Sequence, residues 1–250
     1  MTDPKATPQP ALAEGYARYA VYFTPAGGSA LATLSAAWLG WDAEAQVERP
    51  APDALPSLAV PHGDLVSQAR RYGFHATLKA PFRLAEGHGA AALDQAAIAF
   101  AAGQRAFEIP ALAVTALGPF LALCPPEPCA PLDALAGAVV RAFEPLRAPL
   151  SEADLAKRRT SPLSAAQDAL LVEWGYPYVF DEFHFHMTLT RAIPDAEARE
   201  RVHAALSGLF APVLAAPIPV REIAIFGDPG ADSSGGARPF HLLKRYPLTG

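Results

Sequence analysis

The sequence is poor in cysteine and lacks any long apolar run. Its two cysteines, Cys124 and Cys129, lie in the proline-rich stretch LALCPPEPCAP. Structural zinc sites need two further ligands nearby and usually space their cysteines by roughly two to four residues. We therefore expect two ordinary thiols in a cytoplasmic protein. No stretch approaches the ~18–20 consecutive apolar residues of a membrane span, so no membrane partner is expected.

Positive charge is also scarce. The chain has 20 Lys and Arg against 25 Asp and Glu, a net charge of −5 at pH 7. Binding along an extended nucleic acid needs many Lys and Arg to neutralise phosphates, so that class of partner is excluded. A small phosphorylated substrate needs only a local cluster of donors. Residues 1–15 lack the basic start and apolar run of a secretory signal, and we predict that they form a disordered tail.

What the sequence does contain is enough apolar material for a packed core. Hydrophobic residues make up 51% of 250 positions, which suits one large domain or two small lobes, each with its own core. Periodicity predicts helices over 29–41, 89–102, 132–147, 151–157, 164–174 and 195–210. It predicts strands over 18–23, 71–84, 107–114, 118–123, 184–191, 220–226 and 240–246, with a loop from the first helix to about residue 66.

In each half a strand is followed by a helix and then by a pair of strands, which indicates an internal duplication. The predicted fold class is α+β and bilobal. Two pseudo-symmetric lobes of antiparallel sheet with flanking helices would surround a central cleft. A single domain would cover residues 16–250, with the first lobe at about 16–130 and the second at about 131–250. Strands can exchange between the two lobes.

The same five-residue motif occurs in both halves. FHATL at 74–78 and FHMTL at 185–189 agree at four of five positions and lie 111 residues apart. Side chains alternate between the two faces of a strand, so His75, Thr77 and Lys79 should share one face. In the second copy the shared polar face would hold His184, His186, Thr188 and Thr190. The apolar residues between them would turn into two separate cores.

The repeated polar face suits hydrolysis of a phosphodiester without a metal or other cofactor. A single His-x-Thr is common in amphipathic strands, but core packing does not require the polar pair to be repeated. Histidine titrates near neutral pH, so one imidazole can be the base and the other the acid. Threonine hydroxyls can donate hydrogen bonds to the phosphate oxygens. The sequence leaves open which histidine takes which role.

The paired motif resembles that of the 2H phosphoesterase superfamily. Its members include RNA 2′,3′-cyclic phosphodiesterases and RNA ligases of the 2′,5′ type. The flanking stretches YGFHATLKAPF at 72–82 and WGYPYVFDEFHFHMTLT at 174–190 resemble a DUF1045-like subfamily encoded in bacterial phosphonate-utilisation operons. The resemblance implies His75 and His186 as the catalytic pair, with Thr77 and Thr188 binding phosphate. By operon analogy it also implies hydrolysis of phosphoribosyl 1,2-cyclic phosphate.

Several other residues are candidates for substrate binding, each with a plainer alternative. Arg18 and Tyr22 share one face of the first strand and would both line the cleft or lie outside it. Lys79 extends the first motif strand or is solvated, and the same holds for Arg191 in the second copy. Tyr176 and Tyr178, after Trp174, would stack on a base or sugar or only cover a packed loop. Arg158, in the basic run 157–159, would bind a terminal phosphate such as ribose 5-phosphate or end a solvated helix.

Three rival functions remain open. His184 and His186 on one strand face would make a metal pair with Asp181, Glu182 or His241 as third ligand, but this leaves the first motif unexplained. An RNA 2′,3′-cyclic phosphate processing enzyme would use the same chemistry on an RNA terminus. A non-catalytic module that binds phosphate or nucleotide would keep its binding after loss of either histidine. The sequence does not fix the oligomeric state.

Overall fold

The computed structural model describes residues 11–53 and 55–250. Its strands are β1 (Arg18–Phe23), β2 (Trp41–Asp42), β3 (Val47–Glu48), β4 (Ala76–Phe82), β5 (Phe107–Ile109), β6 (Ala113–Leu117), β7 (Phe120–Cys124), β8 (Met187–Thr188), β9 (Ile218–Val220), β10 (Glu222–Asp228) and β11 (His241–Pro247). Its helices are α1 (Ala30–Leu39), α2 (His62–Val66), α3 (Ala90–Ala102), α4 (Ala130–Phe143), α5 (Glu152–Arg158), α6 (Ala165–Trp174) and α7 (Ala196–Phe210). Short 3-10 turns lie at Ala69–Tyr72, Glu144–Leu146, Phe180–Glu182 and Ala211–Val213.

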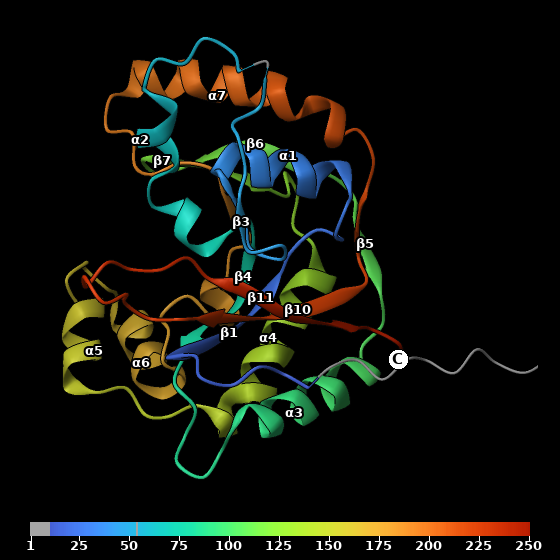
Figure 1. The fold of residues 1–250 in the computed structure, drawn as a ribbon, viewed down its shortest axis with the longest axis vertical. Coiled ribbons are helices and arrows are strands. Elements are labelled where there is room, and N and C mark those ends of the chain that lie inside the picture. Colours follow the sequence, from blue (N-terminus) through green and yellow to red (C-terminus); the bar gives the residue numbers. More distant parts are fainter. Residues whose placement is uncertain (1–10, 54) are drawn as a thin grey trace, which may run out of the picture.

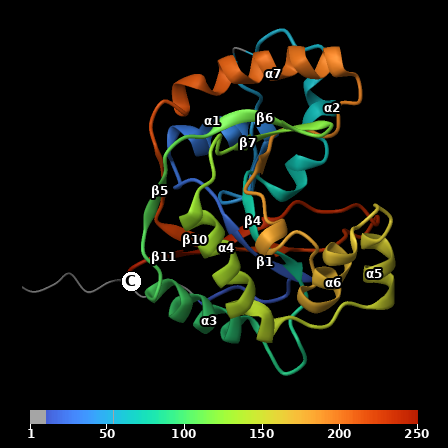
Figure 2. The ribbon, with the colours of Figure 1, turned by 180° about the vertical axis from the view of Figure 1, so that it is seen from behind.

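An antiparallel sheet runs through the molecule. Within the described residues it has seven strands in the order β11-β10-β1-β4-β8-β7-β6. Helix α4 packs on β4 and α3 on β11, while α7 packs on β6 and β7. Both ribbon views place α1 and α7 at one end of the molecule and α3 and α4 at the other (Figures 1 and 2). The predicted α+β class, with an antiparallel sheet and flanking helices, is confirmed.

The duplication is visible in the order of the elements. The series β1-α1-β4-α3-β5-β6 is repeated as β7-α4-β8-α7-β9-β10, apart from short intervening elements. The two motif strands β4 and β8 are neighbours at the middle of the sheet. Strand β6 of the first series pairs with β7 of the second, and β10 of the second pairs with β1 of the first. The short strands β5 and β9 pair with each other. The two halves therefore exchange strands.

The motif strands share one hydrophobic core, so the prediction of two separate cores is wrong. The apolar motif residues all belong to a single buried cluster: Phe74, Ala76, Leu78, Phe185, Met187 and Leu189. The same cluster includes residues of α1, α3, α4 and α7. Because β4 and β8 pair directly, their apolar faces lie on the same side of one sheet. A smaller cluster, which includes Tyr22 and Phe226, packs on the opposite face of β1 and β10.

Both motif strands are shorter than the periodicity predicts. The predicted strand 71–84 begins with a 3-10 turn, because Gly73 has a φ of 70° and interrupts the extended chain. The predicted strand 184–191 is reduced to β8. After β8, the backbone amides of Leu189 and Thr190 both donate to the carbonyl of Leu121, which ends the regular ladder. Motif position alone does not reveal these interruptions.

Other boundaries differ where tertiary pairing decides them. The predicted strand 107–114 is split into β5 and β6, which pair with different partners. The predicted loop up to residue 66 contains the hairpin β2–β3 and helix α2, and β9 was not predicted. Residues 1–10 of the predicted tail lie outside the described residues, whereas Leu12 is buried in the core. Cys124 and Cys129 are free thiols. Among the described residues, no helix is both long and apolar enough to cross a membrane.

Candidate active site

Thr77 and Thr188 lie on the adjacent strands β4 and β8, and His75 and His186 lie directly before these strands. Ala76 of β4 is paired with Met187 of β8 in an antiparallel register. That register sets Thr77 opposite His186 and His75 opposite Thr188, on the face away from the core. Directly opposed residues of an antiparallel pair have Cα atoms about 4.5–5.5 Å apart. The fold therefore brings together the two histidines and two threonines that the sequence selected.

The two histidines are oriented by the same local hydrogen bond. Nδ1 of His75 lies 2.9 Å from the carbonyl oxygen of Gly73, and Nδ1 of His186 lies 2.8 Å from the carbonyl oxygen of His184. A carbonyl only accepts hydrogen bonds, so Nδ1–H is the donor in each ring. Each Nε2 is then left for chemistry. The hydroxyl of Thr77 lies 3.3 Å from Nε2 of His75.

The ring of Tyr22 is stacked on the imidazole of His75. It lies on β1 directly opposite Thr77 and is 1% exposed. Burial lowers the pKa of His75 to about 4; the hydrogen bond to Gly73 opposes this shift, and the charge of His186 adds to it. His75 is therefore a neutral imidazole at pH 7, with a lone pair on Nε2. Burial also raises the pKa of Tyr22 well above its usual value, so this phenol stays neutral.

Gly73 is the backbone feature that places the first histidine. Its φ of 70° favours glycine, and a Cβ at this position would lie 2.8 Å from the Cβ of Ala43. The turn places the carbonyl oxygen of Gly73 within hydrogen-bonding distance of Nδ1 of His75. The stretch YGFH at 72–75 thus encodes both the turn and the orientation of the ring.

Two adjoining cavities lie at the first motif and at Thr188 of the second, and His186 is not among the residues that line them. One cavity, of about 280 Å³, is lined by His75 and Thr77 of the first motif and by Thr188 of the second. Its other lining residues are Arg18, Tyr22, Tyr72, Ala80, Pro81, Arg158 and Tyr176. A neighbouring cavity of about 310 Å³ shares Tyr72, His75 and Thr188 with it and extends to Phe120 and Arg191. His75 and Thr188 thus stand between two spaces that can hold the two sides of a scissile ester. The second ring, His186, is half-buried, with its centroid 6.0 Å from that of Phe120.

The structure places three further predicted residues at the first cavity. Tyr22, Tyr176 and Arg158 all line it. Tyr178 lies 5.5 Å from Tyr176, centroid to centroid, but is 42% exposed and is not among the residues that line the cavity. Trp174 lines the basic cavity described below and packs edge-on against Phe180.

Lys79 does not share the face of His75, contrary to the alternation. Thr77 is paired with Tyr22, whereas Lys79 is paired with the next residue back along β1, Val21, so a bulge at Leu78 reverses the side-chain alternation. The Lys79 ammonium is 4% exposed and donates to Glu144 at 2.7 Å and to the carbonyl of Val140 at 3.1 Å. Lys79 is thus tied to the end of α4 and lines the adjoining cavity instead.

The residues proposed for a metal pair do not gather around His186. The carbonyl of His184 orients the imidazole of His186, and the His184 residue is exposed. His241 is hydrogen-bonded to the hydroxyl of Tyr16 at 2.9 Å. Throughout residues 11–53 and 55–250, no three His, Cys, Asp or Glu side chains form a group that would hold a metal ion.

Sequence reasoning gave no role to Tyr72, which lines both cavities beside His75. Its position directly before Gly73, in a stretch already singled out, was the available signal. Arg18, together with Tyr22, was predicted to line the cleft. It lines the cavity while its guanidinium is bonded to Asp228. The position of Tyr72 and the pairing of Arg18 with Asp228 cannot be read from strand parity, because both depend on segments far apart in the sequence.

Residues 77–234 match the model of a family described as "Protein of unknown function (DUF1045)". Two proteins named "Ribose 1,5-bisphosphate phosphokinase PhnN" are similar over most of this chain. The one from Janthinobacterium sp. (strain Marseille) is 40% identical over 252 residues, 95% of this chain and 52% of the relative. The one from Laribacter hongkongensis (strain HLHK9) is 37% identical over 218 residues, 87% of this chain and 50% of the relative. This chain thus spans about half the length of the curated relatives it matches.

Among solved structures, the chain is similar to E. coli LigT complexed with 3′-AMP, with 16% identity, a TM-score of 0.42, and coverage of 93% of this chain and 98% of that one. It is also similar to a structure named only as a phosphoesterase, with 16% identity, a TM-score of 0.40, and coverage of 93% and 99%. Similarity at this level leaves the chemistry to be argued from the site itself.

Proposed function

This chain belongs to the DUF1045 family, and we propose that it is a metal-independent phosphoesterase that opens a cyclic phosphodiester of a small phosphorylated sugar or nucleotide. One observation carries the proposal. Two His-x-Thr motifs lie side by side on β4 and β8, and each imidazole is held by its Nδ1 so that Nε2 is left for proton transfer. A 2H-type reaction needs this pair of groups at one phosphorus atom.

His75 is the proposed base. Its pKa of about 4 keeps Nε2 unprotonated at neutral pH, and it lies at the junction of the two cavities. In the reaction Nε2 of His75 takes a proton from water, and the water oxygen forms a new bond to phosphorus. The bond from phosphorus to one ring oxygen breaks. His186 enters this step protonated on both ring nitrogens and donates its Nε2 proton to that oxygen, giving a phosphomonoester and a free hydroxyl.

The two threonines are proposed to stabilise charge on the phosphoryl group. Thr77 and Thr188 lie diagonally across the β4–β8 pair, each opposite a histidine. Their hydroxyls can donate hydrogen bonds to the non-bridging oxygens, which carry the most charge in the transition state. The 3.3 Å contact of Thr77 with Nε2 of His75 is one that substrate would replace.

The relatives' names support a phosphorylated ribose as the substrate. These names describe an activity on ribose 1,5-bisphosphate, in proteins about twice the length of the matched region. This chain has no Gly-x-x-x-x-Gly-Lys-Ser/Thr phosphate-binding loop, so we assign the kinase activity in that name to a part of the relatives that this chain does not match. Two parts of one polypeptide then act on related phosphoribosyl compounds, which favours phosphoribosyl 1,2-cyclic phosphate here.

The test is a hydrolysis assay in EDTA. The panel contains phosphoribosyl 1,2-cyclic phosphate, nucleoside 2′,3′-cyclic phosphates and a 3′,5′-cyclic nucleotide. We expect turnover that persists in EDTA and falls by about 10²–10⁴-fold in His75→Ala and in His186→Ala. The control is His88→Ala, an exposed histidine whose Nδ1 lies 3.3 Å from the local carbonyl of Glu86.

Each outcome of this assay separates the candidates. Activity lost in EDTA and restored by zinc would overturn the mechanism in favour of a metal site. Turnover restricted to the 2′,3′-cyclic phosphates would favour an RNA-terminus substrate. Binding without turnover, unchanged in both histidine variants, would favour a non-catalytic module.

A further inference from the structure

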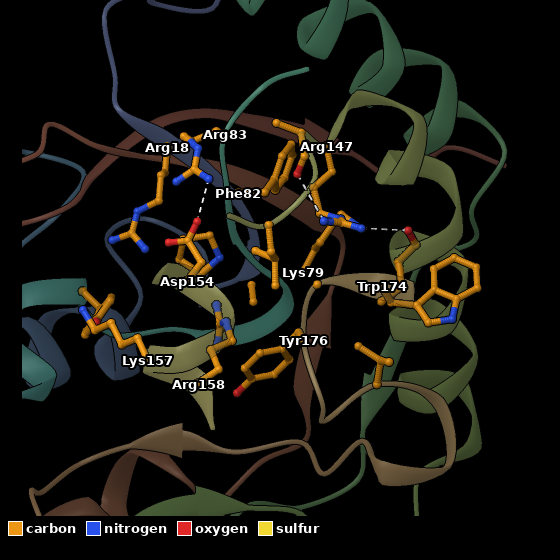
Figure 3. A pocket seen from close by; sticks show the side chains of 18 of the residues that line it. Arg18, Lys79, Phe82, Arg83, Arg147, Asp154, Lys157, Arg158, Trp174 and Tyr176 are labelled. Atoms are coloured by element: carbon orange, nitrogen blue, oxygen red, sulfur yellow. Dashed lines mark hydrogen bonds and ion pairs between the residues drawn. The ribbon is translucent and has the colours of Figure 1, made fainter. Parts of the chain in front are cut away.

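A basic cavity adjoins the proposed active site. It has a volume of about 320 Å³ and lies between β4 and the segment that contains α5 and α6 (Figure 3). It shares six lining residues with the cavity at His75: Arg18, Tyr72, Ala80, Pro81, Arg158 and Tyr176. One molecule can therefore reach from the histidines into this second space.

Positive charge is concentrated around this cavity in a chain of net charge −5. Seven cationic side chains line it: Arg18, Arg71, Lys79, Arg83, Arg147, Lys157 and Arg158. Arg18 and Arg71 share Asp228, Lys79 and Arg147 share Glu144, and Arg83 pairs with Asp154. Seven cations thus face three carboxylates, an excess of four positive charges. Such an excess focuses an attractive field on an anion that enters.

Arg158 is the cation best placed to contact that anion. It lies where the two cavities join, on α5 at the end opposite the Ser151 cap. Its guanidinium carbon is 5.0 Å from the ring centroid of Tyr176, an interaction that orients the planar group without using its N–H donors. Within residues 11–53 and 55–250 it forms no ion pair. Figure 3 shows Arg158 and Tyr176 beside each other, with Lys157 on the same helix.

We propose that this basic cavity binds a second, non-reacting phosphate monoester of the substrate, with Arg158 as its main contact. The inference rests on the proposed function and narrows its substrate class. The preferred substrate is a small cyclic phosphodiester that carries a separate terminal phosphate, rather than a nucleoside cyclic phosphate with a free hydroxyl there. A guanidinium presents paired N–H donors that match a phosphate. Binding energy from this remote group would hold the cyclic ester against the histidines.

The binding test uses the full chain with His75→Ala and His186→Ala, so that nothing is turned over. Ribose 5-phosphate, ribose and inorganic phosphate are titrated by calorimetry. We expect ribose 5-phosphate to bind, ribose not to bind, and Arg158→Gln to weaken ribose 5-phosphate binding by about 10- to 100-fold. The affinity of Arg158→Lys for ribose 5-phosphate should lie between those of the parent and of Arg158→Gln, because lysine keeps the charge but lacks the paired N–H donors of the guanidinium. Inorganic phosphate binding as tightly as ribose 5-phosphate would overturn the assignment to a sugar-borne phosphate.

The matched control is Arg159→Gln. Arg159 is the next residue, is exposed, and pairs with Asp168, so its loss should leave binding unchanged. Ribose 5-phosphate binding that survives Arg158→Gln would overturn the proposal. So would equal losses in Arg158→Gln and Arg159→Gln. Melting temperatures of the variants, measured alongside, identify any loss that is due to unfolding.

The kinetic test uses the chain with both histidines and cyclic esters with and without the terminal phosphate. Arg158→Gln should lower kcat/KM about 10- to 100-fold for the phosphorylated ester and clearly less for the other. Equal losses on both esters would overturn the subsite. If no cyclic ester is hydrolysed but ribose 5-phosphate binding depends on Arg158, the proposed function fails and the subsite stands. If turnover depends on the histidines but not on Arg158, the proposed function stands and the phosphate subsite fails.

Discussion

The ring of Tyr22 is stacked on the imidazole of His75, with centroids 3.9 Å apart and an angle of 23° between the planes. Tyr22 lies on β1 and His75 lies directly before the neighbouring strand β4, and Phe226 packs against both rings, with its centroid 5.0 Å from Tyr22 and 6.3 Å from His75. One face of the His75 imidazole is therefore shielded from water by the buried ring of Tyr22. This relationship sets the protonation state on which the proposed mechanism depends.

Removing that shield should raise the pKa of His75. In Tyr22→Leu the imidazole gains access to water, which stabilises its charged form, so its pKa should rise from about 4 towards about 6.5. An NMR titration of the His75 ring proton measures the shift. Tyr178→Leu is the control, because Tyr178 is 42% exposed. An unchanged His75 pKa in Tyr22→Leu would show that burial by this ring is not the cause.

Stability should fall in mild acid because of the same histidine. The unfolded chain binds a proton at His75 below pH of about 6.5, whereas the folded chain binds it only below about 4. Acidification therefore favours unfolding throughout that window, and the loss stops below pH of about 4. Since part of the ring is accessible, we expect a contribution of about 2–3 kcal/mol.

Urea unfolding at pH 7 and at pH 4.5 measures this contribution. The drop in unfolding free energy between the two pH values should be smaller in His75→Gln than in the parent chain. His88→Gln, at an exposed loop position, should show the full drop. The same drop in His75→Gln as in the parent would contradict the low pKa of His75.

Gly73→Ala should disturb the first motif specifically. The substitution places a Cβ 2.8 Å from that of Ala43 and forces alanine into a φ of 70°, at a cost of about 1–3 kcal/mol. The His75 hydrogen bond to the Gly73 carbonyl would shift with the turn. Gly63→Ala is the control, because Gly63 lies within helix α2 with open space at the Cβ position. Thermal unfolding should show destabilisation only in Gly73→Ala.

The two threonines should affect turnover rather than folding. Thr77→Val and Thr188→Val remove one hydroxyl each at nearly constant volume, so kcat should fall by about 10²-fold or more. Thr77→Ser and Thr188→Ser keep the hydroxyl and should retain most activity. Thr33→Val, at an exposed position of helix α1, is the control. Steady-state kinetics in which valine and serine variants lose equal activity would assign the threonines to packing.

The sequence by itself determined the parts of this protein that depend on local pattern. The alternation within FHATL and FHMTL predicted which side chains are apolar and buried, because strand parity is a property of a few adjacent residues. Capping and periodicity located α1, α3, α6 and α7 to within a few residues. The repetition also selected His75, Thr77, His186 and Thr188 as a set before their positions in space were known.

Only the tertiary structure decided how those parts meet. The pairing of Ala76 with Met187 makes one sheet and one core where two were predicted, and it depends on residues 111 positions apart. The bulge at Leu78 turned Lys79 away from the motif face, because strand parity holds only where the register is regular. The basic cavity gathers cations from β1, β4, α5 and the turn before β4. Long-range register and charge clustering have no local sequence signature, so Arg158 could be predicted from the sequence as one phosphate contact, whereas the cavity that gathers seven cations beside the motifs could not.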